Sequence, residues 1–408
     1  MAQTLRFSSS LRTEPLEVTL SRARAVAQRL GISRVTDITR LDCVGVPVFA
    51  SIRPNALPGS LCVNAGKGIS VTEAKVGAYM EAIEYAFAEF NLSSLKIKNV
   101  KAGDVYEGKT RRDSILDFCP VMGSTIDLDE PMACVEAVDI GTRKKFLVPA
   151  ELVFLPYPAQ LGGNRYFGST SNGLSSGNSV LEATVHGLAE VIERDICSFQ
   201  SIKDESALVE KESLPPMVQK INSTLFEAGL QLYVRYLGNK FQLPDFMSVV
   251  AEWKSDDPIY VSAGYGCHPS RDIALTRSVC EALQSRLSFI HGGRDDLIGR
   301  YYRFKGWSRQ ARRSYAGKLL RKVTENGKSI SFKSTDDQSK LARDLDSALK
   351  LLMTILKNNG FRHALRIVYT PASFPLQVVR IIVPGLECFN ETTTRIGPRL
   401  RDYVRDEI

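Results

Sequence analysis

Glutamates recur at matching places in two long segments of the chain. Residues 70–84 read SVTEAKVGAYMEAIE and residues 179–193 read SVLEATVHGLAEVIE, with eight of fifteen positions identical. A fainter third copy, residues 270–284, keeps Glu281 and has Gln284 where the others have glutamate. Repeated carboxylates are candidates for metal and phosphate chemistry, because Mg2+ prefers carboxylate oxygens and in turn binds phosphates.

Three glutamates of the second copy fall on one side of a predicted helix. At 100° per residue, Glu182 lies within about 20° of Glu193, and Glu190 within about 60°. Arg194 follows directly. Carboxylates about 5 Å apart repel by about 3 kcal/mol at an effective dielectric near 20, so we expect a compensating positive charge.

Two interpretations of this acidic face stay open at this point. A magnesium–phosphate site is favoured, and a solvated acidic face is the alternative. The first two copies also open with Ser-x-x-Glu, a capping box that could do no more than begin a helix. The repeat nevertheless predicts that the helices over 70–90, 179–200 and 272–291 converge on one site.

Glycine-rich loops precede the first two copies, NAGKG at 64–68 and SNGLSSGN at 171–178. A loop before a helix N-terminus offers free backbone N–H groups to an anion. Neither loop is a P-loop, since Lys67 is followed by glycine instead of serine or threonine, and neither has the dinucleotide-binding pattern.

At these residues the chain resembles the YcaO family over nearly its whole length. The family's three motif regions correspond to GAYMEAIEY at 77–85, SNGLSSGNSVLEATVHGLAEVIERD at 171–195 and GCHPSRDIALTRSVCEALQSR at 266–286. The resemblance implies a mixed α/β fold of the YcaO type, in which carboxylate-bearing helices converge on an ATP site without a P-loop.

The resemblance also implies roles for individual residues. The implied magnesium ligands are Glu81, Glu84, Glu182, Glu190 and Glu193. The implied ATP contacts are Arg12, Thr19, Lys67, Ser175, Asn178, Arg194, Glu281, Gln284 and Arg286. The residues expected to carry catalysis are Glu190, Glu193, Arg194 and Arg286.

The implied activity is ATP-dependent phosphorylation of a peptide backbone amide oxygen, which then leaves as phosphate. A neighbouring Cys, Ser or Thr would give an azoline, sulfide a thioamide, and an amine an amidine. Tyr85 and Gly77 stand where the family usually has arginine and serine, and the chain ends in RDYVRDEI instead of the Pro-rich tail of many azoline-forming members. Because neither that tail nor a fused leader-binding domain is visible, we favour a thioamide, or the product of another external nucleophile, over an azoline. The expected substrate is a peptide or protein, with a TfuA-type or leader-binding partner.

Two other functions stay open. Tyr85 would permit a non-catalytic ATP-binding subunit that regulates another enzyme. The segment 297–324, with nine Lys or Arg and no acid, could bind an acidic leader peptide, a partner or RNA, although nucleic acid is disfavoured. A solvated helical surface is the simplest interpretation of that segment.

Composition and short motifs exclude several classes of protein. The chain has 408 residues, 44% apolar and 24% charged, with a net charge of +8. No run of 18 apolar residues and no secretory signal are present, so we expect a cytoplasmic protein without a membrane span. Eight cysteines without a CxxC pair and four histidines without an HxxxH pattern predict free thiols and no zinc site.

Helical and strand-like segments alternate along the chain. Helices are expected over 16–30 and 342–358 besides the three repeats, and strands in VGVPVFASIRP, FLVPAELVFLPY, QLYVRYL, FMSVVAEW, IYVSAGYG, FRHALRIVYT and LQVVRIIVPG, of which the last ends the fold. We expect one catalytic unit, with approximate subregions 1–165, 166–298 and 299–408, and a homodimer.

Overall fold

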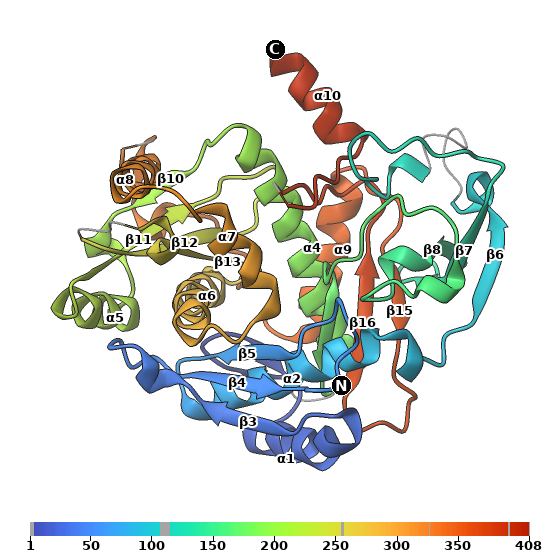
Figure 1. Cartoon of the computed structure of the whole chain (residues 1–408), viewed down its shortest axis with the longest axis horizontal. Coiled ribbons are helices and arrows are strands. Elements are labelled where there is room, and N and C mark those ends of the chain that lie inside the picture. The colour runs from blue at the N-terminus through green and yellow to red at the C-terminus, as the bar shows by residue number, and fades with distance from the viewer. Residues whose placement is uncertain (1–3, 107–114, 254–256, 326, 391, 408) are drawn as a thin grey trace. The chain divides into compact units, whose positions relative to one another are not determined.

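The computed structural model describes residues 4–106, 115–253, 257–325, 327–390 and 392–407 (Figure 1). It divides into two compact units, each assembled from segments far apart in the sequence. Unit 1 is Met1–Ala56, Leu61–Ala82 and Asp204–Asp344, and unit 2 is Leu57–Ser60, Ile83–Lys203 and Leu345–Ile408. These interleaved segments differ from the three contiguous subregions expected above, and a single catalytic unit stays a prediction.

Unit 1 is built on a five-stranded sheet with the order β13-β12-β11-β10-β14. Its strands are β10 (Ala207–Val209), β11 (Leu230–Tyr236), β12 (Asp245–Glu252), β13 (Ser262–Cys267) and β14 (Ser329–Ile330). Its helices are α5 (Pro216–Glu227), α6 (Arg271–His291), α7 (Ile298–Arg303) and α8 (Arg309–Thr324). Only the β10–β14 pair is parallel among the described pairs of this sheet.

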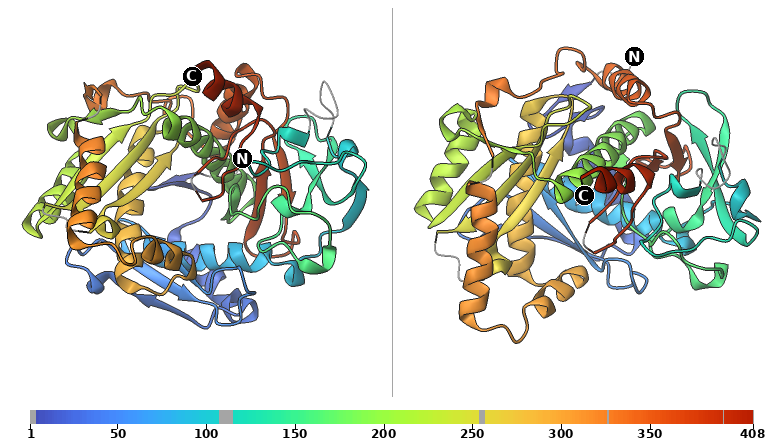
Figure 2. Two further views of the ribbon diagram at one scale, coloured as in Figure 1. Left: turned by 45° about the horizontal axis from the view of Figure 1, so that its top comes forward. Right: turned by 90° about the horizontal axis from the view of Figure 1, so that it is seen from above.

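Side-chain alternation along β12 assigns these helices to opposite faces of the sheet. Phe246 and Val250 pack with apolar residues of α5 and α6. Val249 and Ala251 pack instead with Val323 of α8. Successive side chains of a strand point to opposite faces, so α8 covers the face that α5 and α6 leave open. Both views of Figure 2 let α8, in orange, be followed along this unit.

A second, three-stranded sheet of unit 1 has the order β3-β4-β5. It consists of β3 (Arg34–Asp37), β4 (Val48–Ile52) and β5 (Val63–Lys67), and β5 leads into α2 (Val71–Ala88). A short antiparallel pair, β1 (Leu5–Arg6) and β2 (Leu11–Arg12), precedes α1 (Leu16–Ala27). Pro15 directly precedes α1, where proline's missing N–H costs no helical hydrogen bond.

Unit 2 contains a six-stranded sheet with the order β6-β7-β15-β16-β9, and β8 pairs with β7. Its strands are β6 (Ile97–Lys101), β7 (Pro131–Asp139), β8 (Lys145–Pro149), β9 (Leu174–Gly177), β15 (Leu365–Val368) and β16 (Gln377–Ile382). Helix α4 (Val180–Ile202) packs on β9 and β16 and against α9 (Leu345–Asn358), and α10 (Pro398–Glu407) follows.

The three repeated segments share one local structure. Each is a helix preceded by a strand, as β5–α2, β9–α4 and β13–α6, and each strand lies at an edge in the order of its sheet. Glycines let helix and strand approach closely: a Cβ on Gly66 would collide with the backbone of Ala78, and one on Gly177 would lie 2.9 Å from the Ala183 nitrogen. The capping boxes form as predicted, with Glu73 N–H donating to Ser70 and Glu182 N–H to Ser179.

The predicted elements are largely confirmed, with differences at several ends: the helix expected over 16–30 is α-helical only to Ala27, and in FRHALRIVYT only β15 is extended. The three repeat helices occur within two residues of their expected ends. The strand expected in IYVSAGYG begins only at Ser262, because Pro258–Tyr260 forms a 3-10 turn. In FLVPAELVFLPY only β8 is extended, and Ala150–Leu152 is a 3-10 turn. In VGVPVFASIRP only β4 is extended. The chain does not end with the strand at 376–385, since α10 follows it.

Gly66→Ala tests the strand–helix contact. The added methyl group would meet main-chain atoms of α2, which cannot rotate away, so we expect a loss of at least about 2 kcal/mol in the free energy of unfolding. Gly299 in α7 has open space around it, and Gly299→Ala should be neutral or slightly stabilising. Urea denaturation measures both; equal stabilities of the two variants would contradict the close packing.

Candidate functional site

One glutamate occupies the same position in all three helices and binds a backbone N–H of the preceding edge strand or, for Glu190, of the residue directly before that strand. Glu81, Glu190 and Glu281 are each the eleventh residue of α2, α4 and α6. Their carboxylates accept the N–H groups of Ala65 (2.8 Å), Gly173 (3.1 Å) and Tyr265 (3.4 Å), respectively. Edge strands leave backbone groups that no neighbouring strand takes up. The repeated glutamates therefore have a structural task that fixes where their carboxylates lie.

Helices α2 and α6 converge on β5 in unit 1. The carbonyl of Ala65 accepts a hydrogen bond from Gln284, and its N–H is donated to Glu81. Lys67, two residues along the same strand, forms an ion pair with Glu281. The strand thus brings together four predicted site residues, and the ammonium of Lys67 lies against the carboxylate of Glu281.

Burial changes the pKa of one carboxylate in this cluster. Enclosure among neighbouring atoms raises the pKa of Glu81 above its ordinary value of 4.5. The guanidinium of Arg294, the Ala65 N–H and the Lys67 ammonium oppose this shift. Because burial destabilises the charged form of this carboxylate, a positive charge bound beside it would stabilise that form.

In unit 2 the predicted residues gather around β9 and the first turns of α4. Ser176 donates a hydrogen bond of 2.5 Å to Glu84. Asn178 lies 3.4 Å from Glu182, whose side chain is 2% exposed. Glu193 is 5% exposed. The alternative of a solvated acidic face is therefore wrong for these two glutamates.

The serine that contacts a glutamate is Ser176, which the sequence analysis did not select. The hydroxyl of Ser175 is fully buried and donates to the Ala183 carbonyl within the packing of α4. Neighbouring residues of a strand face opposite sides. That alternation was the signal that distinguishes the two serines.

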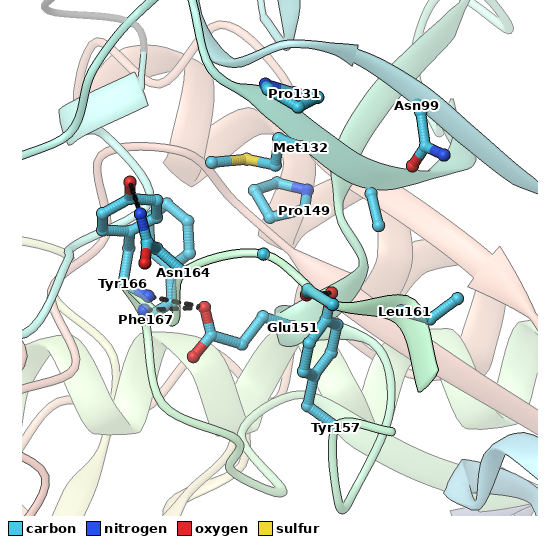
Figure 3. A pocket seen from close by; sticks show the side chains of 13 residues that line it. Asn99, Pro131, Met132, Pro149, Glu151, Tyr157, Leu161, Asn164, Tyr166 and Phe167 are labelled. Atoms are coloured by element: carbon cyan, nitrogen blue, oxygen red, sulfur yellow. Dashed lines mark hydrogen bonds between the residues drawn. The ribbon is translucent and has the colours of Figure 1, made fainter. Parts of the chain in front are cut away.

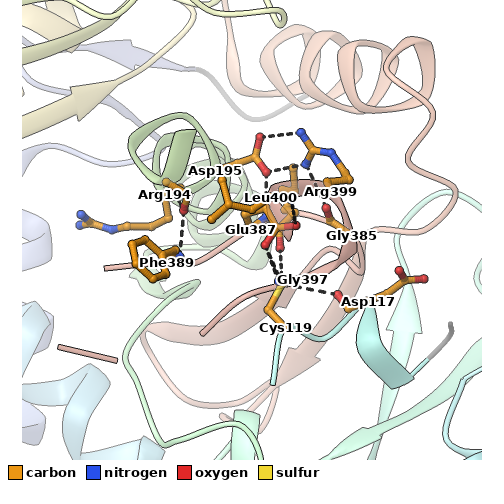
Figure 4. A network of polar contacts seen from close by, with 12 residues as sticks. Asp117, Cys119, Arg194, Asp195, Gly385, Glu387, Phe389, Gly397, Arg399 and Leu400 are labelled. Carbon is orange, nitrogen blue, oxygen red and sulfur yellow. Dashed lines mark hydrogen bonds and ion pairs between the residues drawn. The ribbon is translucent and has the colours of Figure 1, made fainter. Parts of the chain in front are cut away.

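Arg194 lies at the edge of a polar network that anchors α4. Asp195 binds Arg399 through both carboxylate oxygens (2.6 and 3.3 Å) and accepts the Glu387 N–H. Figure 4 shows Arg194 extending away from this network, and its guanidinium lies 3.4 Å from Glu193. Asp195 thus fixes the helix while Arg194 stays beside the acidic residues.

Glu387 holds the start of α10 in the same network (Figure 4). Its carboxylate accepts the N–H groups of Gly397 (2.6 Å) and Leu400 (2.9 Å). Burial raises the pKa of Glu387 although these donors oppose the shift. The segment after the last strand is thereby tied to α4.

Three more of the predicted ATP-contacting residues lie in unit 1, and each forms a hydrogen bond within that unit. The guanidinium of Arg286 is nearly buried and binds Asp42 at 3.0 and 3.4 Å. Arg12 donates to Ser10 from β2, and the buried Thr19 hydroxyl donates to the Pro15 carbonyl of its own helix. Asp42 is a partner that the sequence pattern did not reveal, because it lies 244 residues from Arg286.

No cluster of three or more His, Cys, Asp or Glu side chains within the described ranges forms a ready metal cage. All eight cysteines are free, as predicted, and five of them are buried. Mg2+ is usually held by one or two carboxylates, with waters and substrate phosphates completing its shell. The carboxylates at β5 and β9 are compatible with such a site, and their role as metal ligands stays a prediction.

A pocket in unit 2 is lined by none of the predicted site residues. Figure 3 shows it lined by Pro131, Met132, Glu151 and Tyr166, and its volume is about 150 Å³. Pockets for small-molecule ligands are usually about 300–1,000 Å³. The Glu151 carboxylate accepts the N–H groups of Tyr166, Phe167 and Gly168, so it holds the loop that forms the wall.

These features define a mixed α/β protein in which repeated helix glutamates bind the edges of its sheets. The family model described as YcaO cyclodehydratase, ATP- and Mg2+-binding, matches residues 65–387. The chain therefore belongs to the YcaO family. The predicted family, and ATP and Mg2+ as its cofactors, are confirmed.

Relatives and a solved structure agree with this assignment. A protein of Methanothermobacter thermautotrophicus is 30% identical over 382 residues, 92% of this chain and 94% of its own. A Rhizobium leguminosarum bv. trifolii protein encoded in the tfuA 3' region is 28% identical, over 90% of this chain and 87% of its own. The structure of YcaO from Methanopyrus kandleri bound with AMPPCP and Mg2+ superposes with a TM-score of 0.76 at 22% identity, over 97% of this chain and 98% of that one.

No helix in the described part of the chain is long and apolar enough to cross a bilayer.

Glu81→Gln tests the buried carboxylate. Glutamine keeps an oxygen for the Ala65 N–H and removes the charge that burial disfavours. The folded chain binds the Glu81 proton more tightly than the unfolded chain, so this group's contribution to stability is complete below pH 4.5 and is lost as the pH rises through the raised pKa. We expect Glu81→Gln to unfold at a higher temperature than wild type at pH 7, with the difference shrinking toward pH 4.5.

The control for this experiment is the exposed Glu212, whose replacement by glutamine should leave the pH dependence unchanged. A wild-type chain more stable than Glu81→Gln at pH 7 would contradict the raised pKa.

Proposed function

We propose that the chain is an ATP-dependent peptide-modifying enzyme that phosphorylates a backbone amide oxygen. The observation that carries the proposal is the set of helix glutamates fixed at strand edges, within a chain whose family binds ATP and Mg2+. Phosphoryl transfer needs positioning and charge neutralisation more than covalent work by the protein. Carboxylates for a metal and guanidinium groups for phosphate are the parts that such chemistry requires.

The carboxylates proposed to hold Mg2+ are Glu81, Glu84, Glu182, Glu190 and Glu193. When bound, the metal would neutralise phosphate oxygens and stabilise the charge that develops in the transition state. The chain's own task is to keep these carboxylates in place, which the backbone donors at Ala65 and Gly173 do for Glu81 and Glu190.

Two cations have different proposed roles. Arg194, 38% exposed beside Glu193, would contact the transferring phosphate. Lys67 would balance the acidic cluster through Glu281 and donate to a phosphate oxygen when nucleotide is present.

Arg286 has a different proposed role. To reach a phosphate it would have to give up both of its hydrogen bonds to Asp42, so we propose that Arg286 mainly positions the 39–42 turn. Four other residues stay proposed nucleotide contacts: Arg12, Thr19, Ser175 and Asn178.

We further propose a thioamide as the product, on a ribosomally made peptide or protein. The Rhizobium relative encoded beside tfuA supports this choice, because a TfuA-type partner would deliver the sulfide that acts as the external nucleophile. In the proposed reaction, hydrosulfide adds to the amide carbon and ATP transfers its γ-phosphoryl group to the former amide oxygen, which releases ADP. The C–O bond then breaks as phosphate leaves, the sulfur gives up its proton, and a C=S bond forms.

Glu190→Gln tests the carboxylate site. Glutamine can still accept the Gly173 N–H, so the fold should persist, but the charge available to Mg2+ is lost. We expect Mg·ATP affinity to fall by at least about tenfold, as removal of groups around a metal typically costs. Calorimetric titration measures it, with the exposed Glu227→Gln as a matched control. Wild-type affinity in Glu190→Gln would refute the assignment.

Mass spectrometry of the modified peptide decides the product. Thioamide formation replaces one oxygen by sulfur and requires a sulfur source, whereas cyclisation removes one water from a peptide with Cys, Ser or Thr. We expect the first change, dependent on sulfide and on the partner protein. Water loss without either would show that the chain forms azolines.

A further inference from the structure

Helix α8 and the segment before it carry a cluster of cations without acidic residues among them. Residues 297–324 contain nine Lys or Arg and no Asp or Glu. Arg312 is paired with Asp257, and Arg300 donates to the carbonyl of Val261. The other seven cations are exposed: Arg303, Lys305, Arg309, Arg313, Lys318, Arg321 and Lys322.

The inner face of α8 is fully used by packing in unit 1. Ala316 and Val323 are buried, and Leu319 and Leu320 join Val323 against the five-stranded sheet. Ser308 caps the helix by accepting the Ala311 N–H at 3.2 Å. The helix is therefore held rigidly, and its cationic side faces away from the sheet.

The outer face has a neutral strip between two rows of cations. At 100° per residue, Gln310, Ser314 and Gly317 lie within about 60° of one another. Arg313 lies on one side of this strip, and Lys318 and Lys322 lie on the other. Arg309, in the first turn, is on the same side as Arg313 but about 40° further round, toward the packed face. Arg321 lies at the C-terminal end of the strip.

Gly317 is unexplained by packing within the described chain. A Cβ there would meet only the end of the Arg321 side chain, at 3.6 Å. Glycine inside a helix is less stable than alanine. The absent side chain leaves room for another backbone to approach the strip closely.

The spacing of the cations suits an extended acidic chain. Arg309 and Arg313, like Lys318 and Lys322, are one helical turn apart, about 6 Å along the axis. In an extended chain, side chains on the same side recur every second residue, about 6.5–7 Å apart, and alternate residues point the opposite way. A run of acidic residues lying along the strip would direct its carboxylates alternately to the two rows.

We infer that the outer face of α8 docks an extended acidic segment of a polypeptide. Identifying that polypeptide as the one that the chain modifies rests on the proposed function. Single-stranded RNA fits less well, because base stacking needs aromatics along the strip, and Tyr315, the aromatic residue of α8, packs in a cluster with Phe304. A membrane surface fits less well too, since the apolar face of α8 is covered by the sheet.

Fluorescence anisotropy with a labelled oligoglutamate peptide tests the docking surface on the full chain. Arg313→Glu/Lys318→Glu changes one residue of each row and should weaken binding about tenfold or more, as two lost charge pairs would. Lys96→Glu/Lys144→Glu makes the same change in net charge on exposed residues of unit 2 and should weaken it by less than about twofold, through long-range charge alone. Gly317→Gln should raise or preserve the unfolding temperature and still weaken binding, because the side chain fills the strip.

Three results would overturn the inference: no binding of the peptide by the wild-type chain, equal losses in the two charge-reversed variants, or unchanged binding by Gly317→Gln. Tighter binding of oligouridylate or of phosphatidylserine vesicles, lost in the same variants, would assign the surface to RNA or membrane instead and equally overturn it. Calorimetric binding of Mg·ATP by the same proteins separates this surface from the proposed function. A chain that binds the peptide along α8 but not Mg·ATP would refute the function and leave the docking surface standing.

Discussion

A strand at the edge of a sheet must find partners for its outer backbone groups, and this chain meets that requirement three times with a helix glutamate. The eleventh residue of α2, α4 and α6 accepts an N–H from the strand before its helix or, in α4, from the residue that directly precedes the strand. The contact requires the helix to lie close to the strand, which the glycines at 66 and 177 permit. A structural constraint thus fixes the carboxylates on which the proposed chemistry depends.

Charge balance follows from that placement. Carboxylates pressed against backbone lose solvent, and burial raises the pKa of Glu81 accordingly. The chain supplies cations at the same places, Lys67 against Glu281 and Arg194 beside Glu193. We interpret these pairs as partial compensation, which Mg2+ and the phosphates of ATP would complete.

The repeat could be predicted from the sequence because its determinants are local. Capping boxes, helical spacing and glycines lie within about twenty residues of one another, so they indicated both the helices and their shared glutamates. The 3-10 turn before β13 and the helix α10 were missed, because the first depends on a local turn at Pro258 and the second on contacts with Glu387.

The partners of the site residues were harder to predict than the residues themselves. Glu84 meets Ser176 across 92 residues of sequence, and Arg286 meets Asp42 across 244. No pattern in one sequence identifies such pairs, since they arise only when distant segments fold together. The convergence of α2 and α6 on β5 was predictable from the repeat, whereas the hydrogen bonds from Arg286 to Asp42 were not.

The central claim is that ATP phosphorylates a backbone amide oxygen of a peptide. A peptide substrate labelled with heavy oxygen in its backbone amides, incubated with the chain, its partner protein, Mg·ATP and sulfide, tests it most directly. The account predicts that the released phosphate carries one labelled oxygen for each modified amide, as seen in its mass or its phosphorus NMR shift. Phosphate released without the label, while the peptide is modified, would contradict it.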